Sequence, residues 1–131
     1  MKTPLETIRI GQQGKEQLLK LRRCTGIAHW NILCRWAFCA SLKEKAVPPT
    51  FQQKVDGGVE MSWKVFAGEL SETYTALCWL RAKQDGFPVT PEGFTNCFRA
   101  HLHRGLTFLT AGQKNKSIVD FMGEWLELEQ Y

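Results

Sequence analysis

The sequence predicts a mainly α-helical protein with about five helices and a short strand near its N-terminus. Three observations support this fold class. Apolar residues recur every three or four positions along most of the chain, which is the spacing of helices with one buried face. Glycine and proline stand where several of these segments begin or end. Residues 26–42 are apolar on nearly every side, which is typical of a buried helix.

Length and composition fit a single domain. The chain has 131 residues, of which 44% are hydrophobic and 23% are charged. It contains no run of about 18 apolar residues, so we expect no membrane span. Residues 12–23 are too charged for the apolar core of a signal peptide, and five irregularly spaced cysteines suit a reducing compartment. We therefore expect a cytoplasmic protein.

A short strand is predicted over residues 5–10, because Ile8 and Ile10 fall on one side and Thr7 and Arg9 on the other. It opens the order strand, helix, tight turn, helix, which is that of a ribbon–helix–helix module. In such modules two subunits pair their strands, and outward side chains contact DNA. Under this hypothesis Thr7 and Arg9 would read a specific operator, as in a repressor.

Two helices follow the strand. The first spans about residues 12–24, and Gly26 can end it in a left-handed conformation. The second, about residues 28–42, has only Asn31 and Arg35 as a polar ridge. Because a chain of this size has few positions for a fully buried helix, we expect a second subunit to cover part of it. The predicted interface of this homo-oligomer consists of Trp30, Leu33, Trp36, Ala37 and Phe38.

The domain divides into a basic part with ribbon–helix–helix order, residues 5–45, and a helical part, residues 66–131. Between them, the turn signal Asp56-Gly57-Gly58 and the alternation after it predict a β-hairpin within residues 51–66, with a loop as the alternative. Thr90 and Pro91 are typical of a helix N-cap and first helical position. The remaining helices are expected over about residues 69–83, 90–110 and 117–131, the last with only acidic charges.

No catalytic or metal-binding motif stands out. The chain lacks glycine-rich phosphate loops, the H-E-x-x-H zinc motif and the G-x-S-x-G nucleophile motif. It has no C-x-x-C pair, so we interpret the cysteines mainly as small buried hydrophobes. We therefore expect no enzymatic activity, no metal and no cofactor.

Two histidines lie on the predicted 90–110 helix. His101 is on its apolar side, which favours a packed core histidine. His103, with Arg99 and Arg104 nearby, could bind phosphate, but basic residues on an exposed helix face are usually only solvated.

Charge is distributed unevenly. Residues 1–54 contain ten Lys and Arg against three acids, whereas residues 55–131 contain seven against ten. A basic half is typical of proteins that bind polyanions, and phosphate contacts give affinity without sequence specificity. The candidate DNA-binding residues are Arg9, Lys15, Lys20, Arg22, Arg23, Lys43 and Lys45.

Several segments resemble the DndE family, whose members are accessory proteins of bacterial DNA phosphorothioate modification. The resemblance spans most of residues 5–110 and is strongest at 25–42. It rests on Ile8-Arg9-Ile10, Lys15, Gln17-Leu18, Leu21, Thr25-Gly26-Ile27, Trp30-Asn31, Leu33-Cys34-Arg35-Trp36-Ala37-Phe38-Cys39, Pro48-Pro49 and His101-Leu102-His103-Arg104-Gly105. It implies a homotetramer that binds nicked double-stranded DNA beside the sulfur-transferring components, which replace a non-bridging phosphate oxygen with sulfur.

The leading hypothesis is therefore an accessory DNA-binding subunit for phosphorothioation. The alternatives are a ribbon–helix–helix repressor, a protein scaffold and a nuclease or sulfur-relay enzyme. The scaffold would bind a partner through Trp63, Trp79 or the acidic C-terminal helix. The enzyme would use a cysteine or a metal.

Overall fold

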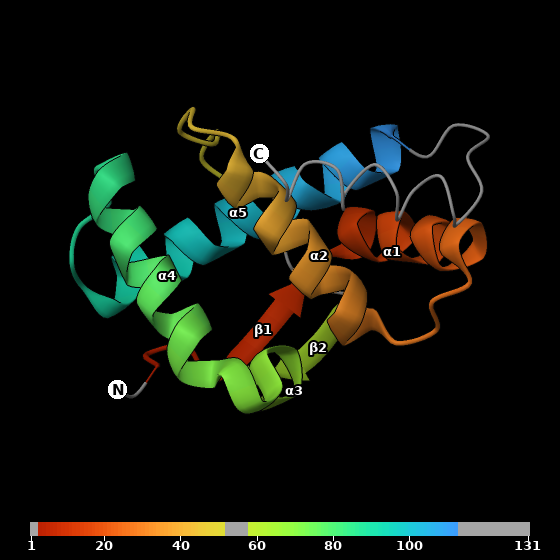
Figure 1. Ribbon diagram of the computed structural model, residues 1–131, viewed down its shortest axis with the longest axis horizontal. Helices are drawn as coiled ribbons and strands as arrows, with labels where there is room; N and C mark the ends of the chain where they lie inside the picture. The colour runs from red at the N-terminus through yellow and green to blue at the C-terminus, as the bar shows by residue number, and fades with distance from the viewer. Residues whose placement is uncertain (1–2, 52–57, 113–131) are drawn as a thin grey trace.

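The computed structural model describes residues 3–51 and 58–112, which are mainly helical (Figure 1). The elements are β1 (Thr7–Ile10), α1 (Gln12–Thr25), α2 (Trp30–Lys43), β2 (Val59–Ser62), α3 (Trp63–Ala67), a 3₁₀ turn (Gly68–Leu70), α4 (Ser71–Asp85) and α5 (Pro91–Ala111). The prediction of a mainly helical protein with a short N-terminal strand is confirmed. The helix predicted at 117–131 lies outside the described residues. None of the described helices is long and apolar enough to cross a membrane.

The two strands form an antiparallel pair in which Thr7 faces Ser62 and Ile10 faces Val59. The second arm of the predicted hairpin within residues 51–66 is present as β2, but it pairs with the N-terminal strand, and residues 52–57 of the first arm lie outside the described residues. The pairing also departs from a ribbon–helix–helix module, since β1 finds its partner strand in its own chain. The predicted alternation is confirmed: the isoleucines of β1 are buried, and its Thr and Arg are exposed.

The residues after β2 form a helix and do not continue the strand. The Ser62 hydroxyl accepts a hydrogen bond from Val65 N at 3.1 Å, so this serine caps α3. Trp63, predicted to lie in a strand, is the first residue of α3, and its indole N–H donates to the Ser71 hydroxyl at 3.1 Å. A local cap thus overrides the alternating pattern.

The polar ridge of α2 is used to hold α3. Asn31 donates to the Val65 carbonyl at 3.2 Å, and Arg35 donates to the carbonyls of Val65 and Phe66. These carbonyls lie in the last turn of α3, where helical carbonyls lack partners within the helix. The ridge therefore fixes a short helix that could not stabilise itself.

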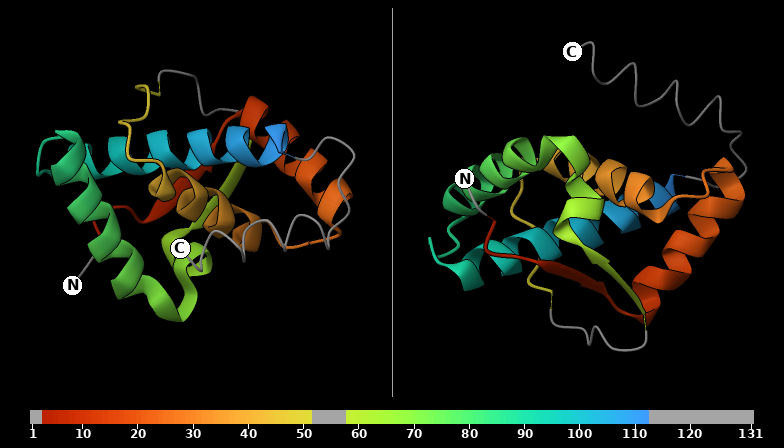
Figure 2. Two further views of the ribbon diagram at one scale, coloured as in Figure 1. Left: turned by 45° about the horizontal axis from the view of Figure 1, so that its top comes forward. Right: turned by 90° about the horizontal axis from the view of Figure 1, so that it is seen from below.

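Helix α5 runs along the molecule, with α4 against its N-terminal half and α1 against its C-terminal half (Figure 2). It begins as predicted, because the Thr90 hydroxyl accepts a hydrogen bond from Gly93 N at 3.0 Å. Helix α2 crosses α5 at Gly105, where an added Cβ would overlap the Ala37 carbonyl oxygen. Only glycine permits so close an approach of the two backbones.

Aromatic rings from α2, α3 and α5 meet at the centre of the core. Phe38 contacts Phe98 with ring centroids 5.0 Å apart, and Phe66 meets Phe98 edge-to-face at 5.1 Å. Such pairs contribute about 0.5–1.5 kcal/mol beyond the burial of their area. The core is thus built where α2 and α5 cross, and α3 closes it on one side.

Candidate nucleic-acid interface

Arg9 lies on the exposed face of β1, where its Nε donates to the Glu60 carboxylate of β2 at 3.1 Å. Both side chains are more than half exposed. An exposed ion pair of this kind is weak, so Arg9 can exchange it for a phosphate at little cost. The carboxylate nevertheless reduces the local positive potential, which makes Arg9 a weaker candidate than the cations of α1.

Four of the predicted DNA-binding residues lie on α1. Lys15 and Lys20 are half-buried, whereas Arg22 and Arg23 are exposed in the last turn. The Arg22 guanidinium lies over the Trp30 ring, 5.3 Å from its centroid. This cation–π contact orients the guanidinium without neutralising its charge.

The two remaining cations lie beyond the other end of α2. Lys43 is the last residue of this helix, Lys45 follows in the loop, and both are exposed. Helix α2 has 14 residues, so its ends are about 20 Å apart. Since Arg22 lies beside the start of α2, the candidate cations form two groups and not a single cluster.

Three of the five residues predicted to form the oligomer interface on α2 lie instead in the core of a single chain. Leu33, Ala37 and Phe38 have no exposed surface within a single chain, because α5 and α3 cover them. They are therefore core residues and are unavailable to a second subunit. Trp30 and Trp36 are half-buried and remain at the surface.

A buried hydrogen-bond network, which sequence reasoning missed, joins α2, α4 and α5. Asp85 accepts from Arg81 Nε at 2.9 Å, and its other carboxylate oxygen lies 2.7 Å from His101 Nε2. His101 Nδ1 lies 2.8 Å from Ser41 Oγ. The prediction of a core histidine is confirmed, but its position on an apolar face gave no sign of these partners.

The same network fixes the loop after α2. Arg81 and Arg104 donate to backbone carbonyls of residues 41–46, among them Ala46 O, which lies 2.7 Å from Arg104 Nη1. These donors satisfy carbonyls at the end of α2 that have no helical partner. The Arg104 guanidinium is therefore occupied by hydrogen bonds to backbone carbonyls. It is not the free phosphate ligand that its proximity to His103 suggested.

Asp85, Cys97 and His101 bring one potential metal-donor atom each within 4.8 Å of one another. Asp85 and His101 already bond to each other, and the Arg81 guanidinium beside the carboxylate opposes a second cation. Hydrogen bonding from Cys78 lowers the pKa of Cys97. The network accounts for Asp85 and His101, Cys97 Sγ donates to Cys78 O at 4.0 Å, and we assign no metal site to these residues.

The interpretation of buried cysteines as small hydrophobes holds for Cys34, which is completely buried. Burial raises the pKa of its thiol to about 12, because a thiolate there would lose its solvation. The cysteines of the described residues form no disulfide. Cys24 and Cys39 are half-buried, and Cys78 and Cys97 are buried.

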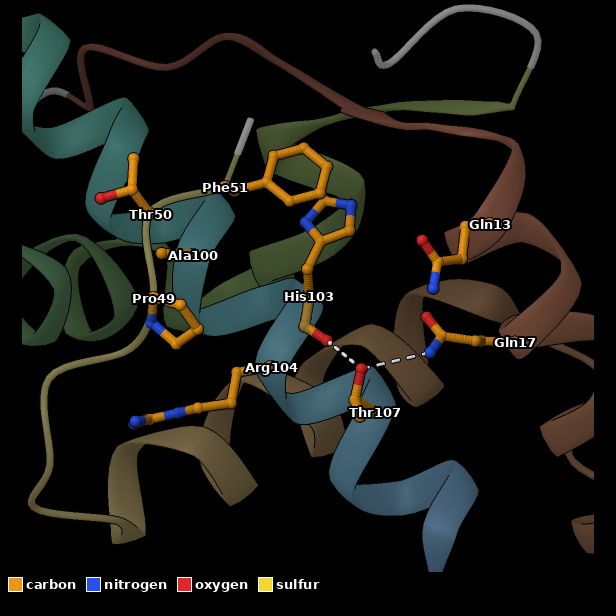
Figure 3. A pocket seen from close by; sticks show the side chains of 9 residues that line it. All are labelled: Gln13, Gln17, Pro49, Thr50, Phe51, Ala100, His103, Arg104 and Thr107. Carbon is orange, nitrogen blue, oxygen red and sulfur yellow. Dashed lines mark hydrogen bonds between the residues drawn. The ribbon is translucent and has the colours of Figure 1, made fainter. Parts of the chain in front are cut away.

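A hollow of about 370 Å³ lies between α1, α5 and the loop after α2 (Figure 3). Residues of α5 form its floor, among them His103 and Thr107, while Gln13 and Gln17 of α1 stand on one side. Pro49, Thr50 and Phe51 of the loop stand on the other. The hollow was not predicted, because its three sides come from distant parts of the chain.

His103 is held in this floor by an aromatic stack. Its ring lies against Phe51 with centroids 3.7 Å apart and planes 17° apart, and its Nδ1 lies 2.8 Å from Arg99 O. Its Nε2 is buried and has no hydrogen-bond partner among the described residues. Burial lowers the pKa of His103, so its ring is neutral at pH 7.

Fold and surface together define a small helical protein with a short two-stranded sheet and exposed cations at both ends of a central helix. The chain belongs to the DndE family of DNA sulphur modification proteins, whose family model matches residues 7–117. Members of this family are involved in DNA phosphorothioation. The resemblance noted in the sequence is thereby confirmed.

Solved structures agree with this assignment at the level of the fold. DndE from Escherichia coli B7A superposes with a TM-score of 0.62 at 23% identity, covering 79% of this chain and 96% of that one. A glycine-to-lysine mutant of DndE superposes with a TM-score of 0.60 at 20% identity, covering 79% and 95%. No curated protein matches the chain.

Proposed function

We propose that this chain is an accessory DNA-binding subunit of the phosphorothioation system and binds duplex DNA, nicked duplex included, through backbone phosphates. The observation that supports this most strongly is the joint presence of DndE family membership and exposed cations at both ends of α2. Arginine and lysine side chains in such positions contact phosphates without reading the base sequence.

The proposal extends to assembly and partners. Two separated groups of cations per chain become a broad basic surface when subunits assemble, so we propose a homotetramer in which Trp30 and Trp36 contact a neighbouring subunit. The tetramer works with the other sulfur-modification proteins in the bacterial cytoplasm. It has no catalytic activity of its own and uses no cofactor.

The test replaces both exposed arginines of α1, as Arg22→Gln and Arg23→Gln, and measures binding to a labelled duplex over a range of salt concentrations. We expect weaker binding and a log–log salt slope that is smaller by about one for each lost phosphate contact. Lys83→Gln serves as a control, because it removes an exposed cation of α4 outside the candidate set. Equal affinity and slope in all three proteins would overturn the proposal.

A second candidate function, a protein scaffold, is favoured by apolar residues exposed on one side of the molecule. Leu70, Leu77 and Leu80 lie along α4 and the turn before it, with exposed fractions of 55%, 38% and 56%. Clustered exposed apolar residues mark protein contacts. The variant Leu77→Ser with Leu80→Ser would then abolish binding to the other sulfur-modification proteins, whereas the arginine variants would retain it.

A further inference from the structure

The hollow beside His103 lies between α1 and the loop after α2, two elements that carry candidate DNA-binding cations. One side belongs to α1, where Gln13, Gln17 and Lys20 follow one another at intervals of four and three residues on one face. The other side is the loop that carries Lys45 and continues to Phe51. A DNA strand whose phosphates contact Lys20 would therefore pass beside the hollow.

The chemistry of the hollow differs from that of a phosphate site. Arg104 is the cation that lines it within the described residues, and its guanidinium is bonded to backbone carbonyls of the loop. His103 is neutral because burial lowers its pKa. Among the described residues of this lining, no cation is therefore free to compensate a phosphate.

What the hollow offers is flat apolar surface and uncharged hydrogen-bonding groups. Pro49 and the stacked rings of Phe51 and His103 provide the flat apolar surface. The amide of Gln13 and the amide of Gln17 provide donors and acceptors, and Gln17 is oriented by its 3.2 Å hydrogen bond to the Thr107 hydroxyl. This combination matches a planar, uncharged heterocycle, which stacks on aromatic rings and bonds through its edge.

We propose that this hollow receives an unpaired nucleobase of the DNA strand bound along α1. The inference rests on the proposed DNA-binding function and names the part of the DNA that this surface takes. The volume of about 370 Å³ falls within the range of small-ligand sites. A base that is already unpaired costs least to move out of the stack, so unpaired positions are the preferred targets.

The experiment compares two labelled duplexes that contain one extra nucleotide at the same position. In one the extra nucleotide is adenosine, and in the other it is an abasic residue, so the number of phosphates and the bulge are matched. We expect the adenosine duplex to bind about tenfold more tightly, as stacking of one base predicts. Both duplexes should show the same salt slope, because the base adds no phosphate contact.

Three variants make the comparison specific. Gln13→Leu removes an exposed amide of the hollow, and Phe51→Ala removes its aromatic surface, so each should abolish the preference for adenosine. Gln12→Leu, at the neighbouring exposed position outside the lining, should retain it. Equal affinity of the unmodified protein for both duplexes, or a preference that survives both lining variants, would overturn the inference while leaving duplex binding intact.

If the protein bound neither duplex, the proposed function would fail, and a free 2-aminopurine nucleotide would decide the inference separately. Binding that is lost in Gln13→Leu would support a nucleobase site that takes free nucleotides. Absence of binding would overturn the inference as well.

Discussion

Asp85 shows how a single buried charge organises this part of the molecule. Its side chain is 3% exposed, yet it accepts hydrogen bonds from both Arg81 and His101. A buried carboxylate is tolerated when its oxygens are paired, and removing the charge leaves its partners uncompensated. Through Arg81, which donates to the carbonyls of Glu44 and Ala46, the carboxylate also helps to fix the loop after α2.

The variant Asp85→Asn should therefore destabilise the protein by about 3 kcal/mol, because the Arg81 guanidinium would stay buried without its counter-charge. Urea unfolding monitored by tryptophan fluorescence measures this change. Lys83→Gln, on the exposed side of the same helix, should alter stability by less than about 0.5 kcal/mol. Similar unfolding midpoints for the two variants would show that the network contributes little.

The lowered pKa of the buried His103 side chain makes the stability of the fold depend on pH. Because burial lowers its pKa below the ordinary value of 6.5, the unfolded chain binds the proton more readily than the folded chain. Above pH 6.5 both states are neutral at this residue. As pH falls below 6.5, stability is lost until the lower pKa of the folded state is passed.

The variant His103→Phe keeps an aromatic ring against Phe51 but cannot be protonated. It should lose less stability between pH 8 and pH 5 than the unmodified protein. Free energies of unfolding at these two pH values provide the comparison, in which the other titrating groups are common to both proteins. An equal loss in both would mean that His103 titrates alike in the folded and unfolded chains.

Several side chains had roles that sequence could not predict, because their partners come from distant segments. Arg35 lies on a predicted helix, but its acceptors are carbonyls of α3. His101 was correctly placed in the core, yet its bond to Ser41 depends on how α2 meets α5. The face of a residue follows from periodicity, whereas the identity of its partner follows from tertiary packing.

At the scale of elements, boundaries were predicted well where a local signal marks them. Gly26 ends α1 with φ at 75°, and Thr90 caps α5, as their sequences indicated. Helix α4 ends at Asp85, two residues beyond the predicted boundary at 83, and Gly86 follows it with φ at 86°. The pairing of β2 with the distant β1 was not predicted, because the period of two does not reveal which strand is the partner.

The close approach of α2 and α5 depends on the absence of a side chain at Gly105. Gly105→Ala should destabilise the protein by about 3 kcal/mol, because the added methyl group would overlap the Ala37 carbonyl and separate the helices. Gly112→Ala is the matched control, since its Cβ would lie 3.5 Å from the nearest atom and its φ is −76°. It should change stability by less than about 1 kcal/mol. Denaturant titration of both variants tests the prediction, which fails if Gly105→Ala is as stable as its control.

At the scale of the whole molecule, the apolar helix α2 is covered largely by other helices of the same chain. Its lack of a polar face suggested a second subunit, but α3 and α5 of the same chain cover Leu33, Ala37 and Phe38. The apolar periodicity correctly indicated that α2 is buried, but it could not identify the elements that cover the helix. The candidate basic residues could likewise be listed from the sequence. Their separation by the length of α2, and the hollow beside them, could be recognised only from the three-dimensional structure.

The division of cations into two groups also bears on assembly. The two groups of candidate cations lie about 20 Å apart in one chain, and in the proposed tetramer equivalent groups would be repeated. Binding and assembly should therefore be measured together on the same protein.

The most direct measurement is the affinity for matched intact and nicked duplexes over a salt series, with the mass of the protein determined by light scattering on the same sample. We predict a tetramer that binds the nicked duplex more tightly and has a log–log salt slope of about −0.9 for each phosphate contact. A monomer that binds both duplexes weakly, with an affinity that does not change with salt, would contradict the proposed function.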